Sequence, residues 1–325
     1  HLGRFVKHII DTAPPDPASF SPDDLLAMFD LGRRFSGMGE DLLRQMVKLM
    51  TMSSADLLDE WFESDQLKAP MSVSGIIGTF LGVRSPGTAY VMLHHYMGEI
   101  DGSFRAWGFA KGGTGAISLA CAGAALEAGV EIRTEASVDQ VLLEGGRAVG
   151  VVLDGGEEIR ANVVSSAVDP HLTFLKLVGS DRLEPDFVAA LQRYRMRGSS
   201  GKVNMAVDRV PNFACRPGDG PHIRGDIAIG PSINYLERAY DDAKRGQFSR
   251  RPFINMVIPS LTDPSVAPPG KHVVSCFVQY APYDLAEGPS AWPEHREAFG
   301  DTVCDTIEEY CPGFKESILH RQVLT

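Results

Sequence analysis

The sequence lacks any regular cysteine pattern. Its five cysteines contain no C-x-x-C pair, which argues against a disulfide framework, a structural zinc site and a thioredoxin-type redox motif. A reducing compartment is the simplest inference. We therefore expect the cytoplasm, or the mitochondrial matrix if the protein is eukaryotic.

Basic stripes and long hydrophobic runs are also lacking. Lysine and arginine number 31 against 42 acidic residues, giving a formal net charge of −11, and the basic residues are scattered. Nucleic acid is not expected as a partner, because phosphate neutralisation needs a basic footprint. The longest weakly polar stretch, residues 71–83, is shorter than the roughly 20 apolar residues that span a bilayer. We expect no integral membrane segment and see no secretory signal.

Motifs for hydrolysis and metal binding are equally scarce. There is no G-x-S-x-G and no H-E-x-x-H, so neither a serine hydrolase nor a zinc protease is supported. His94 and His95 point about 100° apart on a predicted helix, which argues against a shared metal. We expect one packed and one exposed histidine, with acid–base work by one of them as the minority alternative. Cys121 is expected to be a core thiol, and Asp241-Asp242 to lie on a solvated helix face.

What is present is a change of hydrophobic period along the chain. The first hundred residues predict helices: one beginning at Pro22 after a Ser21 cap, then others over 41–50, 53–63 and 88–97. A small-residue helix over 115–129 follows. Residues 130–167 alternate in the manner of strands, with turn signals at 144–146 and 154–156, and close on the apolar strand NVVSSA, 162–167.

The remainder alternates between the two types. Helices are expected over 170–179, 185–195, 233–246 and 294–310, and strands over 202–209, 253–260 and 272–280, with a β-rich run at the end. The fold class is therefore α/β, in the sense of mixed α and β.

One glycine-rich stretch, AKGGTGAIS, precedes the small-residue helix. A dinucleotide fingerprint needs G-x-G-x-x-G directly after a strand. Gly112, Gly113 and Gly115 do not have that spacing, so a pyrophosphate loop is rejected. Two alternatives stay open: a simple structural turn, or a loop whose backbone N–H groups meet a ligand at a helix N-terminus.

The segment from FRAWGFAKGGTGAIS to SSAVDPHLTFLKLVG resembles the phytoene desaturase and amine oxidase superfamily of FAD-dependent oxidoreductases. LDEWFESDQLKA, SPGTAYVMLHHYMG, LTDPSVAPPGKHVVSCFVQYAPY and CPGFKESILHRQVLT are similar, more narrowly, to a group of pyridine nucleotide-disulfide oxidoreductase domain proteins with bacterial members. The resemblance covers nearly the whole chain.

The resemblance implies an FAD-binding domain of glutathione-reductase type, present in part, and a mixed-sheet substrate domain with a helical cap. Residues 1–105 correspond to the helical part of the substrate or cap region, 106–172 to part of the FAD-binding domain, and 173–325 to the second substrate segment. The family's opening G-x-G-x-x-G loop and closing glycine-rich segment have no match. We therefore expect an internal fragment, an expectation that its start at His1 and its end in a β-rich run also favour.

The resemblance also implies where ligands lie. Ile132 to Val141 matches the pattern that places a valine backbone at the adenine, which makes Val138 a candidate FAD contact. Ser166 and Ala167 resemble the loop passing close to the dinucleotide. Gly112 and Gly113 resemble the loop that brings the backbone near the flavin ring or the substrate channel. Candidate residues lining the substrate pocket are His94, Tyr96 and Trp107.

The function implied is hydride transfer between a carbon substrate and flavin in the full-length parent, which makes that parent an enzyme. The substrate is expected to be a small, apolar molecule. FAD binding by residues 1–325 alone is expected to be weak or absent, and this chain alone inactive. The alternative is a redox-inactive interaction or scaffold protein of the same fold.

Overall fold

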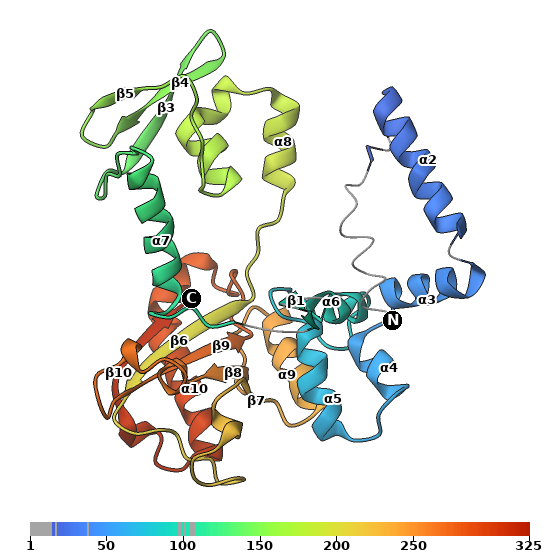
Figure 1. Ribbon diagram of the computed structural model, residues 1–325, viewed down its shortest axis with the longest axis vertical. Coiled ribbons are helices and arrows are strands. Elements are labelled where there is room, and N and C mark those ends of the chain that lie inside the picture. Colours follow the sequence, from blue (N-terminus) through green and yellow to red (C-terminus); the bar gives the residue numbers. More distant parts are fainter. Residues whose placement is uncertain (1–14, 17, 38, 97–98, 101, 105–107) are drawn as a thin grey trace. The chain divides into compact units, whose positions relative to one another are not determined.

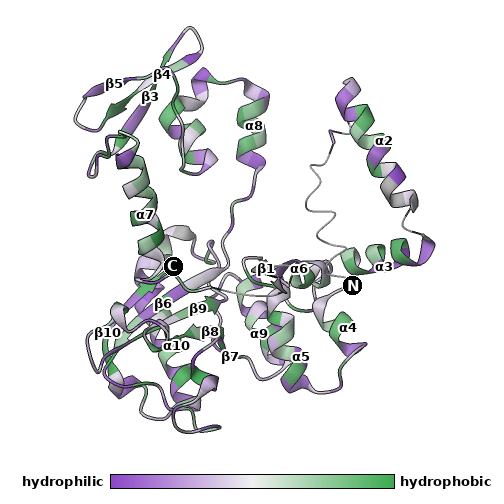
Figure 2. Cartoon of the chain, in the orientation of Figure 1, coloured by the Kyte–Doolittle hydropathy of each residue, from purple (hydrophilic) through white to green (hydrophobic). Residues whose placement is uncertain are grey.

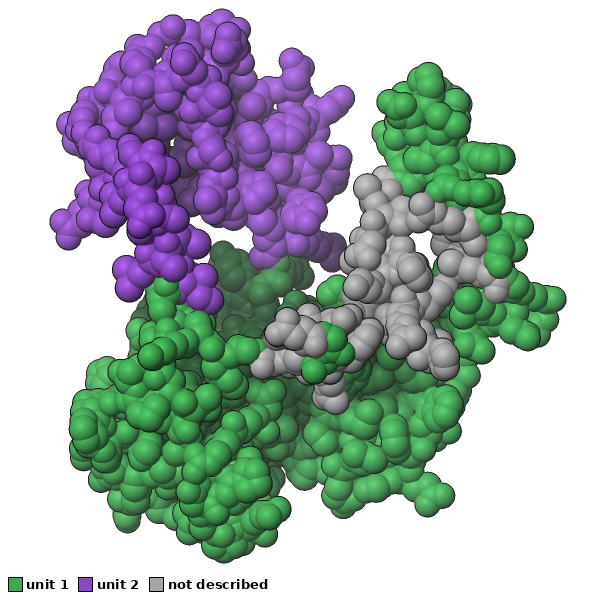
Figure 3. Space-filling model, viewed as in Figure 1, with its two compact units in different colours: residues 1–116, 197–325 green, residues 117–196 purple. Residues whose placement is uncertain are grey.

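The structure, a computed structural model, describes residues 15–16, 18–37, 39–96, 99–100, 102–104 and 108–325. The chain divides into two compact units (Figures 1 and 3). The larger comprises residues 1–116 and 197–325, and the smaller comprises residues 117–196. Because the chain leaves the larger unit and returns to it, the smaller one is an insertion between two segments of one core.

The described part of the first hundred residues is mostly helical, as the sequence predicts. The helices are α2 (Pro22–Gly37), α3 (Glu40–Thr51), α4 (Ser54–Asp59), α5 (Asp65–Ser72), the short η1 (Val73–Gly75) and α6 (Thr88–His95). The Ser21 hydroxyl accepts the N–H of Asp24 at 3.1 Å, and the Ser53 hydroxyl accepts that of Asp56 at 3.0 Å. These side chains satisfy N–H groups that a helix start leaves free. A two-stranded ribbon of β1 (Glu99–Ile100) and β2 (Ser103–Phe104) follows.

A five-stranded sheet organises the larger unit. Its order is β10-β6-β9-β8-β7, formed by β6 (Ser200–Val207), β7 (Ile227–Ile229), β8 (Phe253–Val257), β9 (His272–Gln279) and β10 (Ile318–Leu324). Every pairing between these strands is antiparallel, whereas the resemblance implied a mixed sheet. An antiparallel sheet needs no crossover helix between neighbours. A loop with the 3-10 turn η4 (Pro221–Ile223) connects β6 to β7, and a loop with η5 (Pro259–Leu261) and η6 (Pro264–Val266) connects β8 to β9.

The main core lies between one face of this sheet and α10 (Trp292–Tyr310). Alternate residues of the strands point into it, including Val203, Met205, Cys276 and Met256, because side chains along a strand alternate between faces. From α10, Phe299, Val303 and Ile307 meet them. The turn η7 (Pro289–Ala291) leads into α10, and η8 (Lys315–Ser317) connects it to β10.

The other face is covered at one end by helices. Phe253 and Tyr280 are fully buried in a second cluster with α9 (Ile233–Lys244), α5 and η1. The Tyr280 hydroxyl donates to the Leu81 carbonyl at 2.7 Å, and the Gln279 amide donates to the Ile76 carbonyl at 3.1 Å. These contacts join residues 54–96 to residues 200–325 in one body. A third cluster, around Leu58 and Met92, lies within the helical segment.

The smaller unit contains α7 (Thr114–Glu127), which begins in the larger unit, and an antiparallel three-stranded sheet. The strands are β3 (Val138–Glu144), β4 (Arg147–Leu153) and β5 (Glu158–Arg160), in the order β3-β4-β5. The π-helical turn η2 (His171–Gly179), η3 (Ser180–Arg182) and α8 (Pro185–Arg193) complete it. Both hairpin turns lie where the glycine pairs predict them.

Two strand predictions for this unit are wrong. Residues 130–137 and 162–167 form no strand, although the first alternates in the manner of a strand and the second contains an apolar, β-branched run. A strand is stabilised by hydrogen bonds to a neighbouring strand, and these two segments have no strand partner within residues 117–196, all of which the structure describes.

Candidate functional site

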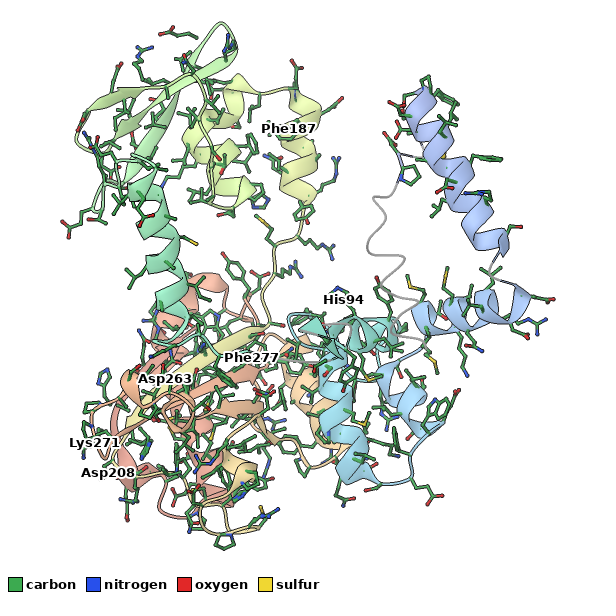
Figure 4. All side chains as sticks on the ribbon, in the orientation of Figure 1. His94, Phe187, Asp208, Asp263, Lys271 and Phe277 are labelled. Atoms are coloured by element: carbon green, nitrogen blue, oxygen red, sulfur yellow. The ribbon has the colours of Figure 1, made fainter. Side chains whose placement is uncertain are left out.

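The glycine-rich loop lies against η6, within the larger unit. Gly112 and Gly113 have φ of 83° and 80°, a left-handed conformation that favours glycine. The N–H of Gly112 donates to Asp263 Oδ2 at 2.5 Å, and that of Gly113 donates to the Ala110 carbonyl at 3.0 Å. Figure 4 labels Asp263. The N–H groups of both glycines therefore donate within the chain, and a carboxylate lies beside the loop.

Asp263 is held in its ionised form. The Ser265 hydroxyl and the backbone N–H of Gly112 hold the pKa of this carboxyl below its usual value, because hydrogen bonds to a carboxylate favour the charged state. The negative charge would repel a pyrophosphate at this loop. This geometry supports the rejection of a phosphate cradle at Gly112 and leaves two alternatives open: a simple structural turn, or close approach of the backbone to a neutral ring or the substrate channel.

Directly after this loop, α7 presents apolar side chains to solvent. Leu119 is 74% exposed and Ile117 is 57% exposed, and no residue of the helix is buried. Figure 2 shows hydrophobic colours along most of its length. A helix that is apolar all round is normally buried. The expectation that Cys121 is a core thiol is wrong: it is exposed, because no layer of the described residues covers the helix that carries it.

The candidate FAD contacts Val138, Ser166 and Ala167 lie in the smaller unit. Val138 is half-buried at the start of β3, while Ser166 and Ala167 are exposed. The Ser166 hydroxyl is 2.7 Å from the Thr173 hydroxyl of η2, and η2 contacts β3. Both regions therefore contact η2 within one small unit. Their contact with FAD stays a prediction.

The pocket candidates lie in or beyond α6. His94 is exposed (Figure 4), and His95 is half-buried, with its Nδ1 3.0 Å from the Val91 carbonyl. The expectation of one packed and one exposed histidine is confirmed. The Tyr96 hydroxyl donates to the Met71 carbonyl at 3.4 Å. Trp107 lies outside the described residues.

The residue-level predictions missed a polar row on the five-stranded sheet. Lys202, Phe277 and Asn255 are register partners across β6, β9 and β8, on the face opposite α10. Lys202 is exposed and the other two are half-buried. In the next row, the Ser275 hydroxyl donates to Asn204 Oδ1 at 2.9 Å. The sequence signal for this row is the alternation in KVNMAV (202–207) and VSCFV (274–278). Every second residue is an apolar core residue, and the residues between them lie on the other face of the sheet.

The three buried cysteines are poorly suited to nucleophilic chemistry. Burial raises the pKa of the Cys276, Cys304 and Cys311 thiols, which disfavours the nucleophilic thiolate. No group of His, Cys, Asp and Glu in the described residues has the arrangement of a metal site. Nor is any helix in that part of the chain long and apolar enough to cross a membrane.

Comparison with known proteins gives several relatives, although no family model matches the chain. Pyridine nucleotide-disulfide oxidoreductase domain-containing protein 2 of Rattus norvegicus is 39% identical over 98% of this chain, and the Mus musculus protein is 38% identical over 98%. The chain covers 57% of either relative. A lycopene-forming phytoene desaturase of Pseudescherichia vulneris is 25% identical over 88% of the chain and 55% of its own length.

A solved structure supports the fold. An oxidoreductase from Methanosarcina mazei matches with a TM-score of 0.54 at 20% identity, over 95% of this chain and 62% of that one. The chain thus spans a little over half the length of the relatives it matches. The expected resemblance is confirmed: this chain is similar over 98% of its length to pyridine nucleotide-disulfide oxidoreductase domain-containing protein 2 and, at lower identity, to a phytoene desaturase.

Proposed function

We propose that this chain is the middle portion of an FAD-dependent oxidoreductase that moves a hydride between a carbon substrate and the flavin. The observation that supports the proposal comes from the smaller unit, where apolar segments that the sequence predicts to be buried are exposed in the structure. Its apolar segments have the composition of a buried α/β layer, yet they are exposed. Kinship with phytoene desaturases supplies the chemical class.

The disagreement is concentrated in three segments. Val163 is 80% exposed in a stretch that reads as a buried strand, and Val130 and Ile132 are exposed in another. Together with α7, they need a neighbouring sheet to bury their side chains and pair their backbone. We infer that strands outside these 325 residues supply that sheet. Parallel strands covered by helices are the layer in which dinucleotide cofactors bind.

The residues present fit only part of FAD. We propose that Val138, Ser166 and Ala167 meet its adenosine side, and that Asp263 makes the Gly112 loop unsuitable for a pyrophosphate. FAD, when bound, supplies the electron transfer. The task that remains for this chain is to bind and orient a carbon substrate and to exclude water from it.

The face of the sheet that carries Phe277 is the best candidate for that task. Phe277 (Figure 4) and Val257 offer apolar contacts, and Asn255 and Lys202 offer polar groups in the neighbouring positions. Apolar contacts beside a few placed polar groups are typical of small-molecule sites. We propose that this face contacts the apolar substrate and that its polar groups orient one polar end of it.

The test compares the natural full-length protein with residues 1–325. We expect the full-length protein to purify yellow, with flavin absorbance that dithionite bleaches, and residues 1–325 to bind FAD weakly or not at all in equilibrium dialysis. A correctly folded, colourless full-length protein would contradict the proposal and favour the scaffold alternative. Tight FAD binding by residues 1–325 would contradict the inferred division of the cofactor site.

A further inference from the structure

A surface pocket of about 710 Å³ lies along α9 and the segment that follows it, in the larger unit. It is lined by residues from the N-cap Ser232 to Arg251 and contains four arginines: Arg238, Arg245, Arg250 and Arg251. Such a concentration of guanidinium groups is unexpected in a chain of net charge −11. None of the functional predictions above uses this pocket.

Two of the four arginines are neutralised within the chain. Asp242, whose side chain is 7% exposed, accepts from the exposed Arg250 through a 2.8 Å bond to Oδ1, and it also accepts the backbone N–H of Arg250 at 3.1 Å. Arg251 pairs with Glu309 and lies over the Tyr235 ring, 5.9 Å from its centroid. Asp242 was expected to be solvated, and its burial and its pairing with Arg250 correct that expectation.

The two acidic residues of the pocket also form ion pairs within the chain. Asp241 pairs with Lys244 at 2.7 Å, and Asp242 pairs with Arg250. Arg238 and Arg245 are exposed, and neither guanidinium has a hydrogen bond or ion pair with another residue of the described chain. The pocket therefore retains two positive charges that the chain does not neutralise.

The helix dipole can account for the position of only one of these two arginines. Arg245 is the C-cap residue of α9, where a cation complements the negative end of the helix dipole. Arg238 lies in the middle of the helix, where that effect is absent. The two residues are seven positions apart, so they share one face of α9, separated by about 10 Å along its axis. Side chains of this length can converge on a ligand between them.

We propose that this pocket binds a small ligand carrying a phosphate group. A phosphate monoester carries close to two negative charges at neutral pH, which matches the two unneutralised guanidinium groups. The planar fork of arginine suits phosphate oxygens, and the volume lies within the roughly 300–1,000 Å³ of small-molecule sites. The half-buried Tyr235 provides an apolar surface for an organic portion. The proposal is independent of FAD and of the redox chemistry.

The test is calorimetric titration of the protein with phenyl phosphate at low ionic strength. We expect saturable binding that weakens with added salt, and a loss of affinity of about tenfold or more in the double variant Arg238→Gln/Arg245→Gln. The matched control, Arg195→Gln/Arg216→Gln, removes the same charge from exposed positions outside the pocket and should retain the affinity. Circular dichroism verifies that all variants fold.

Three results would overturn the proposal. The first is the absence of saturable binding by the unmodified protein. The second is an equal loss in the control variant, which would mean that net charge alone attracts the ligand. The third is equal affinity for phthalate, a dicarboxylate of the same charge, which would mean that the pocket does not select phosphate.

Discussion

Gly201 shows how a single small residue sets the distance between β6 and α10. A Cβ atom at this position would lie 2.6 Å from Cε1 and 2.8 Å from Cζ of Phe299, a fully buried ring. Protein interiors are close-packed, so such an atom forces the ring or the strand to move.

We expect Gly201→Ala to lower the free energy of unfolding by about 1–3 kcal/mol, the usual cost of overpacking a core. Urea denaturation followed by circular dichroism measures it. Gly155→Ala is the control, because no atom lies within 4 Å of the added Cβ. Equal unfolding midpoints for the two variants would show that the core yields at this point without cost.

Asp242 shows that the burial of a single side chain can escape prediction from the sequence. Adjacent acidic residues on a polar helix predict solvent exposure, and Asp241 and Asp242 look alike in the sequence. The difference is made by the chain after α9, which turns back and places Arg250 on Asp242. A partner eight residues away and outside the helix cannot be found from helical periodicity.

At the scale of elements, local signals predicted most helices and both hairpins of the smaller unit. Residues 162–167 are the informative failure, because strand formation depends on a neighbour as well as on composition. Their sequence is compatible with a strand, but no partner is available within residues 117–196.

This failure leads to a prediction about backbone protection. We expect the amides of residues 162–167 to exchange rapidly with solvent in residues 1–325 and to become protected in the natural full-length protein, because pairing would bury their N–H groups. Hydrogen exchange with mass spectrometry measures both. The amides of β9, already paired on both sides, serve as the control and should be protected in each. Rapid exchange of 162–167 in the full-length protein would refute the inferred neighbouring sheet.

At the scale of the whole molecule, burial is distributed unequally between the two units. Within residues 117–196 the buried positions are Val141, Gly150 and Thr173, while the larger unit contains the three hydrophobic clusters. Hydrophobic burial is the main stabilising contribution to folding. The smaller unit should therefore open more readily than the larger one.

We expect limited trypsin digestion to cut first within residues 117–196, for example at Lys176 or Arg195. The two flanking pieces should remain together, because residues 55–83 and 233–280 share one core cluster. Mass spectrometry locates the cuts, and size-exclusion chromatography tests whether the pieces co-elute. First cuts within the sheet strands, or separation of the pieces under native conditions, would contradict this.

The sequence by itself determined the class of the protein, its helices, its hairpins and its kinship, since these depend on local periodicity, turn chemistry and residue identity. Tertiary structure decided which strands found partners, which carboxylate met which guanidinium, and which face of the central sheet stayed open. Those outcomes depend on contacts between residues far apart in the chain, whose positions no local pattern specifies. The glycine-rich loop combines both: its spacing excludes a pyrophosphate fingerprint, and the fold sets Asp263 against it.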